Sequence, residues 1–149
     1  MREAGASPRY PMTGPRGSLA PRLRCRRSVT AVVLAAGLSR RFGSTTNKLL
    51  CLWKGRPIIS HTVGEIIASG VSRVVVVVGH QGEEIARALD GQKVELVNNK
   101  SPADGMSSSL IAGLQRINEG DRPDGVMVCL GDMPLIKSSL IADLIGQFS

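Results

Sequence analysis

Short apolar runs alternate with stretches of helical periodicity through residues 29–149. The runs lack the in-and-out alternation of a half-exposed strand. A continuous apolar run bounded by glycine or polar residues is typical of a strand that is buried on both faces of a parallel sheet. Four strands are therefore predicted, at residues 30–36, 74–78, 94–97 and 126–130.

The stretches between these runs repeat their apolar residues every three or four positions, which predicts amphipathic helices. Pro57 suits the first turn of one helix, because a first turn leaves its amide hydrogens unpaired and proline has none. The four predicted helices lie at residues 57–67, 83–89, 110–117 and 140–145. Strands alternating with helices predict an α/β fold with a Rossmann-like, doubly wound and mostly parallel sheet. In such sheets ligands bind at the carboxyl ends of the strands.

The net charge of +7 and the pI near 10.0 first suggest a polyanionic partner. However, residues 1–28 hold seven arginines and one acid, whereas residues 29–149 hold twelve basic and eleven acidic groups. The part with the strand and helix pattern is therefore nearly neutral. Four aromatic residues are also too few to stack along a single-stranded nucleic acid. We expect no nucleic-acid partner.

Residues 1–28 mix Arg, Pro, Gly and Ser without apolar periodicity, which predicts a disordered tail before a single domain at residues 29–149. Three interpretations of the tail stay open. It is an extension without function, which we favour, a transit peptide, or a twin-arginine export signal built on Arg26 and Arg27.

The three cysteines are scattered and lack metal-ligand spacing, which excludes a disulfide scaffold and a zinc ribbon. A reducing compartment is favoured for the same reason. No apolar run reaches the roughly 18 residues that a membrane-spanning helix requires. We therefore expect a cytoplasmic protein without a membrane partner.

The loop after the first predicted strand combines small residues with basic ones. Ala35, Ala36 and Gly37 allow a ligand to approach the backbone closely, and successive N–H groups can bind an anion. Arg41 and Lys48 add positive charge suited to a polyphosphate. A structural turn with solvated cations would show the same spacing, so both interpretations stay open.

Two further loops also follow predicted strands. Gly105 and the three serines that begin at Ser107 stand at the start of a helix, where N–H groups and hydroxyls bind an anion or a ribose. The alternative is ordinary N-capping, for which Asp104 would serve equally well. Asp132 follows the last strand, where a carboxylate can hold Mg²⁺ against phosphate oxygens. Taken alone, Asp132 would be read as a turn residue before Pro134.

Together the three loops resemble those of the molybdenum cofactor cytidylyltransferases, within the wider group of MobA-like nucleotidyltransferases. The motif L-A-A-G-x-S-x-R-M-G, followed by N-K-L-L, is met at residues 34–43 and 47–50, with Phe42 in place of Met. The motif G-M-S-S-S-L-x-x-G-L is met in full at residues 105–114, and G-D-M-P at residues 131–134. The first motif is common to many sugar and isoprenoid nucleotidyltransferases, whereas the other two together are more specific.

The resemblance implies a sheet of the nucleotide-diphospho-sugar-transferase type and a role for each motif residue. It implies that Arg41 and Lys48 act on the triphosphate and that Asp132 holds Mg²⁺, the expected cofactor. The nucleotide contacts that it implies come from Ala35, Ala36, Gly37, Ser39, Arg41, Lys48, Asn98, Gly105 and Ser107. The family often has Asn-Pro where this chain has Asn98 and Asn99.

The resemblance also implies the reaction. A terminal phosphate of molybdopterin attacks the α-phosphorus of CTP, pyrophosphate leaves, and a molybdoenzyme is the implied recipient of the product. Relatives that use GTP usually read L-A-G-G in the first loop, so Ala36 favours CTP.

Family members continue past the point at which this sequence ends, so we expect a fold that is incomplete at its C-terminus and lacks much of the pterin half. Two other functions stay open: nucleotide transfer to another small phosphate, such as a sugar phosphate, and a non-catalytic nucleotide- or cofactor-binding module.

Overall fold

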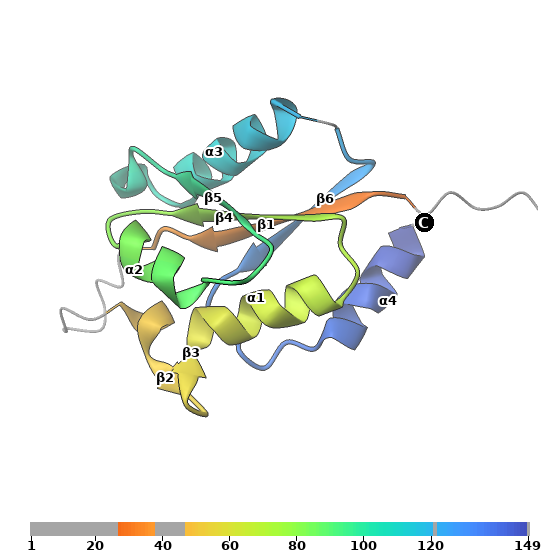
Figure 1. Ribbon diagram of the computed structural model, residues 1–149. Helices are drawn as coiled ribbons and strands as arrows, with labels where there is room; N and C mark the ends of the chain where they lie inside the picture. The colour runs from red at the N-terminus through yellow and green to blue at the C-terminus, as the bar shows by residue number, and fades with distance from the viewer. Residues whose placement is uncertain (1–26, 38–46, 121, 149) are drawn as a thin grey trace, which may run out of the picture.

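The computed structural model describes residues 27–37, 47–120 and 122–148. Its centre is a four-stranded sheet in which every neighbouring pair of strands is parallel (Figure 1). The strands lie in the order β5-β4-β1-β6 and comprise β1 (Val29–Ala35), β4 (Arg73–Val78), β5 (Glu95–Asn98) and β6 (Gly125–Leu130). All four predicted strands are thus present, and the parallel sheet is confirmed.

Helices cover both faces of this sheet, which confirms the doubly wound arrangement. Figure 1 shows α3 on one face and α1 with α4 on the other. The four helices are α1 (Ile58–Ala68), α2 (Gly82–Ala88), α3 (Met106–Asn118) and α4 (Ser138–Phe148). Two single 3₁₀ turns, η2 (Lys48–Leu50) and η3 (Pro102–Asp104), precede α1 and α3.

A small hairpin between η2 and α1 was not predicted. Its antiparallel strands β2 (Leu52–Trp53) and β3 (Arg56–Pro57) contain two residues each, too few for a periodicity to be read. Lys54 and Gly55 make the turn with φ of 48° and 77°, the left-handed region that two-residue hairpin loops use. The ring of His61 fastens the hairpin to α1, because its Nε2 lies 2.7 Å from the Trp53 carbonyl oxygen.

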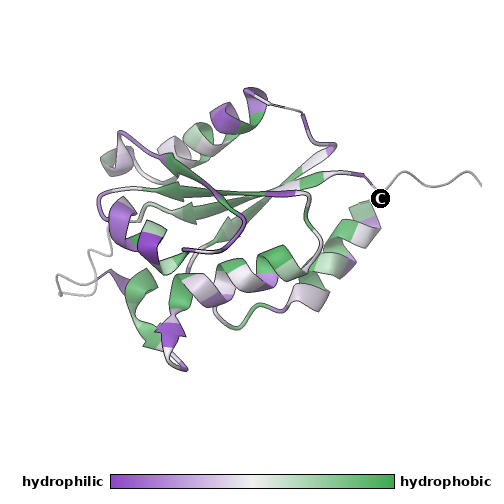
Figure 2. Ribbon diagram, viewed as in Figure 1, coloured by the Kyte–Doolittle hydropathy of each residue, from purple (hydrophilic) through white to green (hydrophobic). Residues whose placement is uncertain are grey.

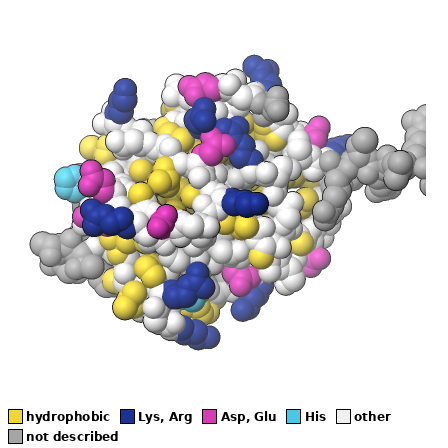
Figure 3. Space-filling view, viewed as in Figure 1, with side chains coloured by type: hydrophobic (Ala, Val, Ile, Leu, Met, Phe, Trp, Pro, Cys, Tyr) yellow, Lys and Arg dark blue, Asp and Glu magenta, His cyan; other side chains and the backbone are white. Residues whose placement is uncertain are grey.

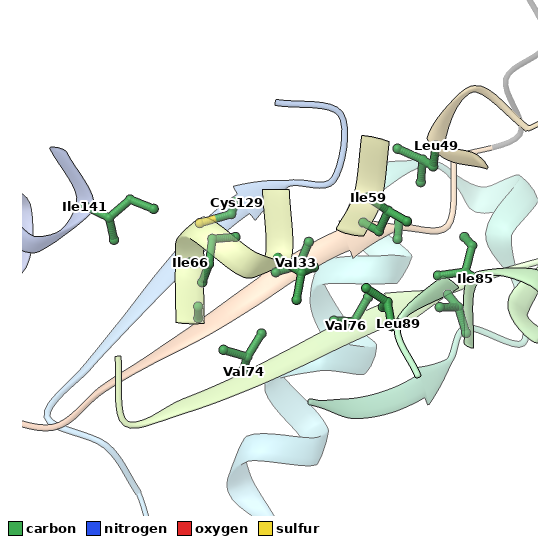
Figure 4. Packing of buried hydrophobic residues seen from close by; sticks show 14 residues of the cluster. Val33, Leu49, Ile59, Ile66, Val74, Val76, Ile85, Leu89, Cys129 and Ile141 are labelled. Carbon is green, nitrogen blue, oxygen red and sulfur yellow. The ribbon is translucent and has the colours of Figure 1, made fainter. Parts of the chain in front are cut away.

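The larger core fills the sheet face that α1, α2 and α4 cover. Val33 and Val76 from the strands pack with Ile59 and Ile66 from α1 and with Ile141 from α4, all of them fully buried (Figure 4). Figure 2 shows that hydrophobic residues run along the central strands, while the outer surface of α2 is hydrophilic. Burial of this apolar surface is the main force that holds the two layers together.

A second core lies between the sheet and α3. Val32, Val75 and Val77 meet Ile117 there, so the central strands are apolar on both faces, as their continuous valine runs predict. A Cβ on Gly113 would lie 2.6 Å from Val32 Cγ1 and 3.1 Å from Val77 Cγ2. Glycine at this position therefore lets α3 lie close against the strands.

The prediction that the strands are buried on both faces is wrong for β5, whose Leu96 is 43% exposed, and for β6. Val126, Val128 and Leu130 of β6 are 41%, 50% and 39% exposed, whereas Met127 and Cys129 face the larger core. The reason is that α3 packs on β4, β1 and β5, so among the described residues no helix covers this side of β6. Burial raises the pKa of the Cys129 thiol, which suits a packing role.

A cluster of charges joins three elements at the amino edge of the sheet. Arg73 Nη2 donates to Glu95 Oε2 at 2.7 Å, and Arg116 Nη2 lies 3.0 Å from the same oxygen. The hydrogen bonds from Arg73, assisted by the positive charge of Arg116, lower the pKa of Glu95. Arg73 and Glu95 are the first residues of β4 and β5, so their contact lies at the opposite end of these strands from the loops that follow them.

The first described residues also contact the folded part of the chain, although the composition places them in the tail. The Ser28 backbone nitrogen and hydroxyl donate to Asp124 Oδ2 at 2.7 and 3.0 Å, which lowers the pKa of Asp124. Arg27 Nη1 donates to the Phe148 carbonyl oxygen at 3.2 Å, and its guanidinium carbon lies 5.4 Å from the centre of the Phe148 ring.

The surface is mixed in charge. Figure 3 shows basic and acidic side chains interspersed over one face of the molecule, in agreement with the near-neutral composition of residues 29–149. Of the helices in the described ranges, none has the length and apolar character that crossing a membrane requires.

Candidate functional site

The loops that the motifs single out meet at one edge of the sheet. Because all four strands are parallel, their carboxyl ends lie together, and the chain leaves β1 at Ala36, β4 at Gly79, β5 at Asn99 and β6 at Gly131 (Figure 1). This is the edge at which ligands bind in doubly wound folds. The topology therefore brings three distant motifs to one place.

The loops after β1 and β4 are in close backbone contact at Ala36 and Gly79. A Cβ on Gly79 would lie 3.0 Å from the Ala36 carbonyl oxygen and 3.2 Å from Ala36 Cα, so only glycine allows this approach without displacement. The sequence pattern singled out Ala36 but not Gly79. The available signal was that Gly79 ends the valine strand.

A crevice of about 40 Å³ lies at this junction. Its lining comprises Ala35, Ala36, Gly37, Asn47, Gly79, His80 and Gln81. The volume suits a water molecule and is far below the several hundred Å³ of a typical ligand pocket. The three small residues predicted to contact a nucleotide therefore lie together and line one small crevice.

Asn47 caps the 3₁₀ turn η2, which begins with Lys48. It is buried, and its Oδ1 accepts a hydrogen bond from the Leu49 backbone nitrogen at 3.0 Å, which caps η2. The cap orients Lys48, the next residue, away from the core. The N-K-L-L motif is thus explained locally as a capped turn that presents a lysine.

Lys48 and Asp132 form an ion pair across the site. Lys48 Nζ lies 3.1 Å from Asp132 Oδ2, and the two side chains are 43% and 39% exposed. Gly131 allows this position, because its nitrogen donates to the Leu34 carbonyl oxygen at 3.0 Å and a Cβ would lie 2.9 Å from Ile59 Cδ1. Two residues predicted to act together are therefore in direct contact.

The carboxylate of Asp132 fits a cation that is shared with a phosphate ligand. In the described parts of the chain, no group of three or more His, Cys, Asp or Glu side chains is arranged to hold a metal ion. Mg²⁺ keeps several waters and is commonly bound by one or two carboxylates together with substrate phosphates. One exposed carboxylate at the end of β6 meets that requirement, whereas a site made by protein ligands alone would need more.

The serine motif begins α3 without a side-chain cap. Gly105 occupies the N-cap position with φ of 91°, and neither Asp104 nor a serine caps the helix. Ser108 and Ser109 instead accept hydrogen bonds from Asn99 at 2.9 and 3.0 Å. The capping alternative is therefore wrong.

The serine nearest the start of α3 differs from the other two. Ser107 is exposed, and its hydroxyl has no hydrogen-bond partner among the residues that the structure describes.

Asn98 and Asn99 have different environments although they are adjacent. Asn98 ends β5 and is exposed, so its predicted ligand contact stays a prediction. Asn99 is buried, and sequence reasoning did not give it a role. Both residues line a hollow of about 600 Å³ between β5 and α3, together with Asp104 and Ser108. Ser39 and Arg41, two other predicted ligand contacts, lie outside the described residues.

Known proteins with similar sequences and structures agree with this fold. Residues 31–149 match the family model described as the MobA-like NTP transferase domain. The protein named bifunctional protein GlmU from Rhizobium etli is 38% identical over 111 residues, which cover 73% of this chain and 24% of GlmU. The chain therefore spans about a quarter of the length of this relative.

Two solved structures share the fold at moderate identity. A nucleotidyl transferase from a Methanothermobacter superposes with a TM-score of 0.68 at 28% identity, over 80% of this chain and 57% of that one. The protein Rv0371c from Mycobacterium tuberculosis superposes with a TM-score of 0.69 at 25% identity, over 81% and 60%. The match of the family model to most of the chain shows that this protein belongs to the MobA-like NTP transferase family.

Proposed function

We propose that the chain is a nucleotidyltransferase domain that transfers the nucleoside monophosphate of a nucleoside triphosphate to a small phosphate-bearing acceptor. The Lys48–Asp132 pair carries this proposal, because it places a cation and a carboxylate at the edge where the small-residue loop, the serine turn and β6 meet. A transfer of this kind needs both charges close to the reacting phosphates.

In the proposed reaction an oxygen of the acceptor phosphate attacks the α-phosphorus. The bond between that phosphorus and the oxygen bridging to the β-phosphorus breaks, and pyrophosphate leaves with the bonding electron pair. The nucleophile is already anionic, so little proton transfer is required of the protein. Alignment and charge neutralisation therefore supply the catalysis.

The chain's own residues have separate tasks in this scheme. The backbone at Ala36 and Gly37 would line the nucleotide, and Lys48 would exchange its contact with Asp132 for one with the triphosphate. Asp132 would hold Mg²⁺, which when bound would neutralise phosphate charge. Rv0371c, which shares this fold, is also known in a complex with manganese. Arg41 is proposed to add a second positive charge on the triphosphate.

Our specific proposal is CMP transfer from CTP to molybdopterin, as the G-M-S-S-S-L and G-D-M-P motifs favour. Ala36 supports CTP, because the relatives that use GTP usually have glycine at this position of the loop. A sugar phosphate is the second acceptor class. The names of the relatives, GlmU and nucleotidyl transferase, specify no acceptor.

Pyrophosphate release tests the proposal. The full chain is mixed with Mg²⁺, each of the four ribonucleoside triphosphates in turn, and either molybdopterin or a hexose 1-phosphate. Release with CTP and molybdopterin alone supports the specific proposal, and release with the hexose phosphate supports the second acceptor class. Nucleotide binding without release under any condition would instead indicate a binding module.

A further inference from the structure

The connection between β5 and α3 is held by a buried amide side chain. Asn99 is 5% exposed, and its Nδ2 donates to Ser108 Oγ at 2.9 Å and to Ser109 Oγ at 3.0 Å. Its Oδ1 accepts from the Ser101 backbone nitrogen at 2.9 Å, and its own backbone nitrogen donates to the Val78 carbonyl oxygen at 2.8 Å. The side chain of Asn99 thus links both ends of the connection, and its backbone nitrogen ties it to the end of β4.

Ser108, the less buried of the two serines that Asn99 contacts, also lies close to backbone carbonyl groups of the same turn. Ser108 Oγ lies 2.9 Å from the Ser101 carbonyl oxygen and 2.8 Å from the Gly105 carbonyl oxygen. Hydrogen bonds therefore tie residues 101–105 to Asn99 and to the first turn of α3. A hydrogen-bond network of this kind is rigid when every polar group is satisfied.

Asparagine suits this position for a chemical reason. Its amide presents two donors and one acceptor in one plane, and all three are used here. Aspartate would lose the donors, and alanine would leave the buried Ser109 hydroxyl without this partner. Asn98, one residue earlier, is exposed on the strand and makes none of these contacts.

We propose that Asn99 is a positioning residue for nucleotide transfer. It holds Gly105 at φ of 91° and directs the Ser107 hydroxyl and the first N–H groups of α3 toward the phosphate or ribose of the nucleotide. Asn99 does not touch the ligand itself and acts through the turn. This inference rests on the proposed function, because the ligand is the nucleotide of that reaction.

Nucleotide titration and steady-state kinetics of the full chain test this role. We expect Asn99→Ala to raise the Kd and the KM for the triphosphate about tenfold while kcat changes by less than about twofold, as for the loss of a ground-state contact. Ser107→Ala should give a similar rise. The matched control Asn118→Ala should stay within about twofold of the wild type, since this exposed asparagine ends α3 and holds no part of the turn.

A double-mutant cycle shows whether Asn99 acts through Ser107 or affects nucleotide binding independently of it. If Asn99 acts through Ser107, the double variant Asn99→Ala, Ser107→Ala binds the nucleotide no more weakly than Asn99→Ala alone. Fully additive losses would overturn the inference, as would an unchanged Kd in Asn99→Ala. If Asn99→Ala fails to fold, Asn99→Asp and Ser109→Ala replace it, with the same rise in Kd expected.

Amide hydrogen exchange provides a readout that does not need the reaction. Without nucleotide, exchange should accelerate about tenfold or more in Asn99→Ala at the amides of Ser101 and Asp104, which donate to Asn99 Oδ1 and to the Ser101 carbonyl oxygen. Exchange at these two amides should remain unchanged in Asn118→Ala. Unchanged exchange in Asn99→Ala would overturn the positioning role whatever the nucleotide data show. If the turn loosens as expected but the wild type binds no nucleoside triphosphate, the proposed function fails, and with it the role of Asn99 in transfer.

Discussion

Lys48 Nζ lies 3.1 Å from Asp132 Oδ2, although 84 residues separate the two in the sequence. One residue comes from a capped turn beside β1 and the other from the loop after β6, the two neighbouring strands of the sheet. An ion pair with both partners this exposed contributes only about 0–1 kcal/mol to stability. The pair lies at the carboxyl ends of the strands, where doubly wound folds bind ligands, and this position fits the proposed function.

Substituting Lys48 should therefore affect binding far more than folding. We expect Lys48→Met to raise the Kd for the nucleoside triphosphate about tenfold, because a charge-assisted contact with phosphate is lost. Its Tm should change by no more than a few degrees. Calorimetric titration and thermal unfolding measure the two quantities. Lys93→Met, on the exposed surface after α2, is the control, and equal binding by the two variants would refute the assignment of Lys48.

The close approach of α3 to the sheet depends on Gly113. A methyl group on Gly113 would lie 2.6 Å from Val32 Cγ1, so Gly113→Ala should destabilise the protein by about 1–3 kcal/mol through overpacking. At Gly64 in α1 the same methyl would meet nothing within 4 Å. Gly64→Ala should therefore stabilise the protein by about 0.5–1 kcal/mol. Urea unfolding compares the two variants, and a neutral Gly113→Ala would mean that α3 lies farther from Val32.

Acid should unfold the protein partly through Glu95. The hydrogen bonds from Arg73 lower the pKa of Glu95 below its ordinary value of 4.5, so the folded state holds the charged form more strongly than the unfolded chain does. This contribution is complete above pH 4.5 and is lost as the pH falls through the lowered pKa. In Glu95→Gln, stability should therefore fall less steeply below pH 4.5 than in the wild type.

Urea midpoints between pH 3 and pH 7 would show this difference. Glu84→Gln, on the exposed surface of α2, is the matched control and should follow the wild-type profile. A Glu95→Gln profile parallel to that of the wild type would show that the cluster with Arg73 and Arg116 does not contribute to acid stability.

Removal of residues 1–26 and removal of residues 1–28 should have different effects on the Tm. Removing residues 1–26 should leave the Tm and any transfer activity unchanged. Removing Arg27 and Ser28 as well should lower the Tm, because the bonds from Ser28 to Asp124 and the contact of Arg27 with Phe148 are lost. Thermal unfolding of the two truncated chains tests this, and identical Tm values would show that those contacts do not stabilise the domain.

The parallel sheet and the alternation of strands with helices follow from patterns that the sequence displays directly. The valine run at residues 74–78 is apolar on both faces because helices lie on both sides of β4, which is what such runs predict. The exposed face of β6 could not be predicted, because its residues are as apolar as those of a buried strand. Whether a helix covers a strand depends on where the chain crosses over, and periodicity does not report that.

The candidate site, too, was predicted only in part from the sequence. The motifs placed Lys48 and Asp132 in separate loops, and only the three-dimensional structure shows them 3.1 Å apart. Gly79 and Asn99 went unnoticed because their roles depend on contacts with Ala36 and with two serines, which no local pattern encodes. The residues proposed to contact a ligand belong to motifs, whereas Gly79 and Asn99 were found by geometry.

The most direct measurement compares Asp132→Asn with Asp143→Asn in pyrophosphate release from CTP and molybdopterin, with Mg²⁺ present. Asp143 is an exposed carboxylate on α4 and serves as the control. Nucleotidyl transfer at this edge of the sheet predicts that the wild type and Asp143→Asn release pyrophosphate at equal rates. Asp132→Asn should be slower by about a hundredfold or more. An Asp132→Asn variant that releases pyrophosphate as fast as the wild type would contradict the account.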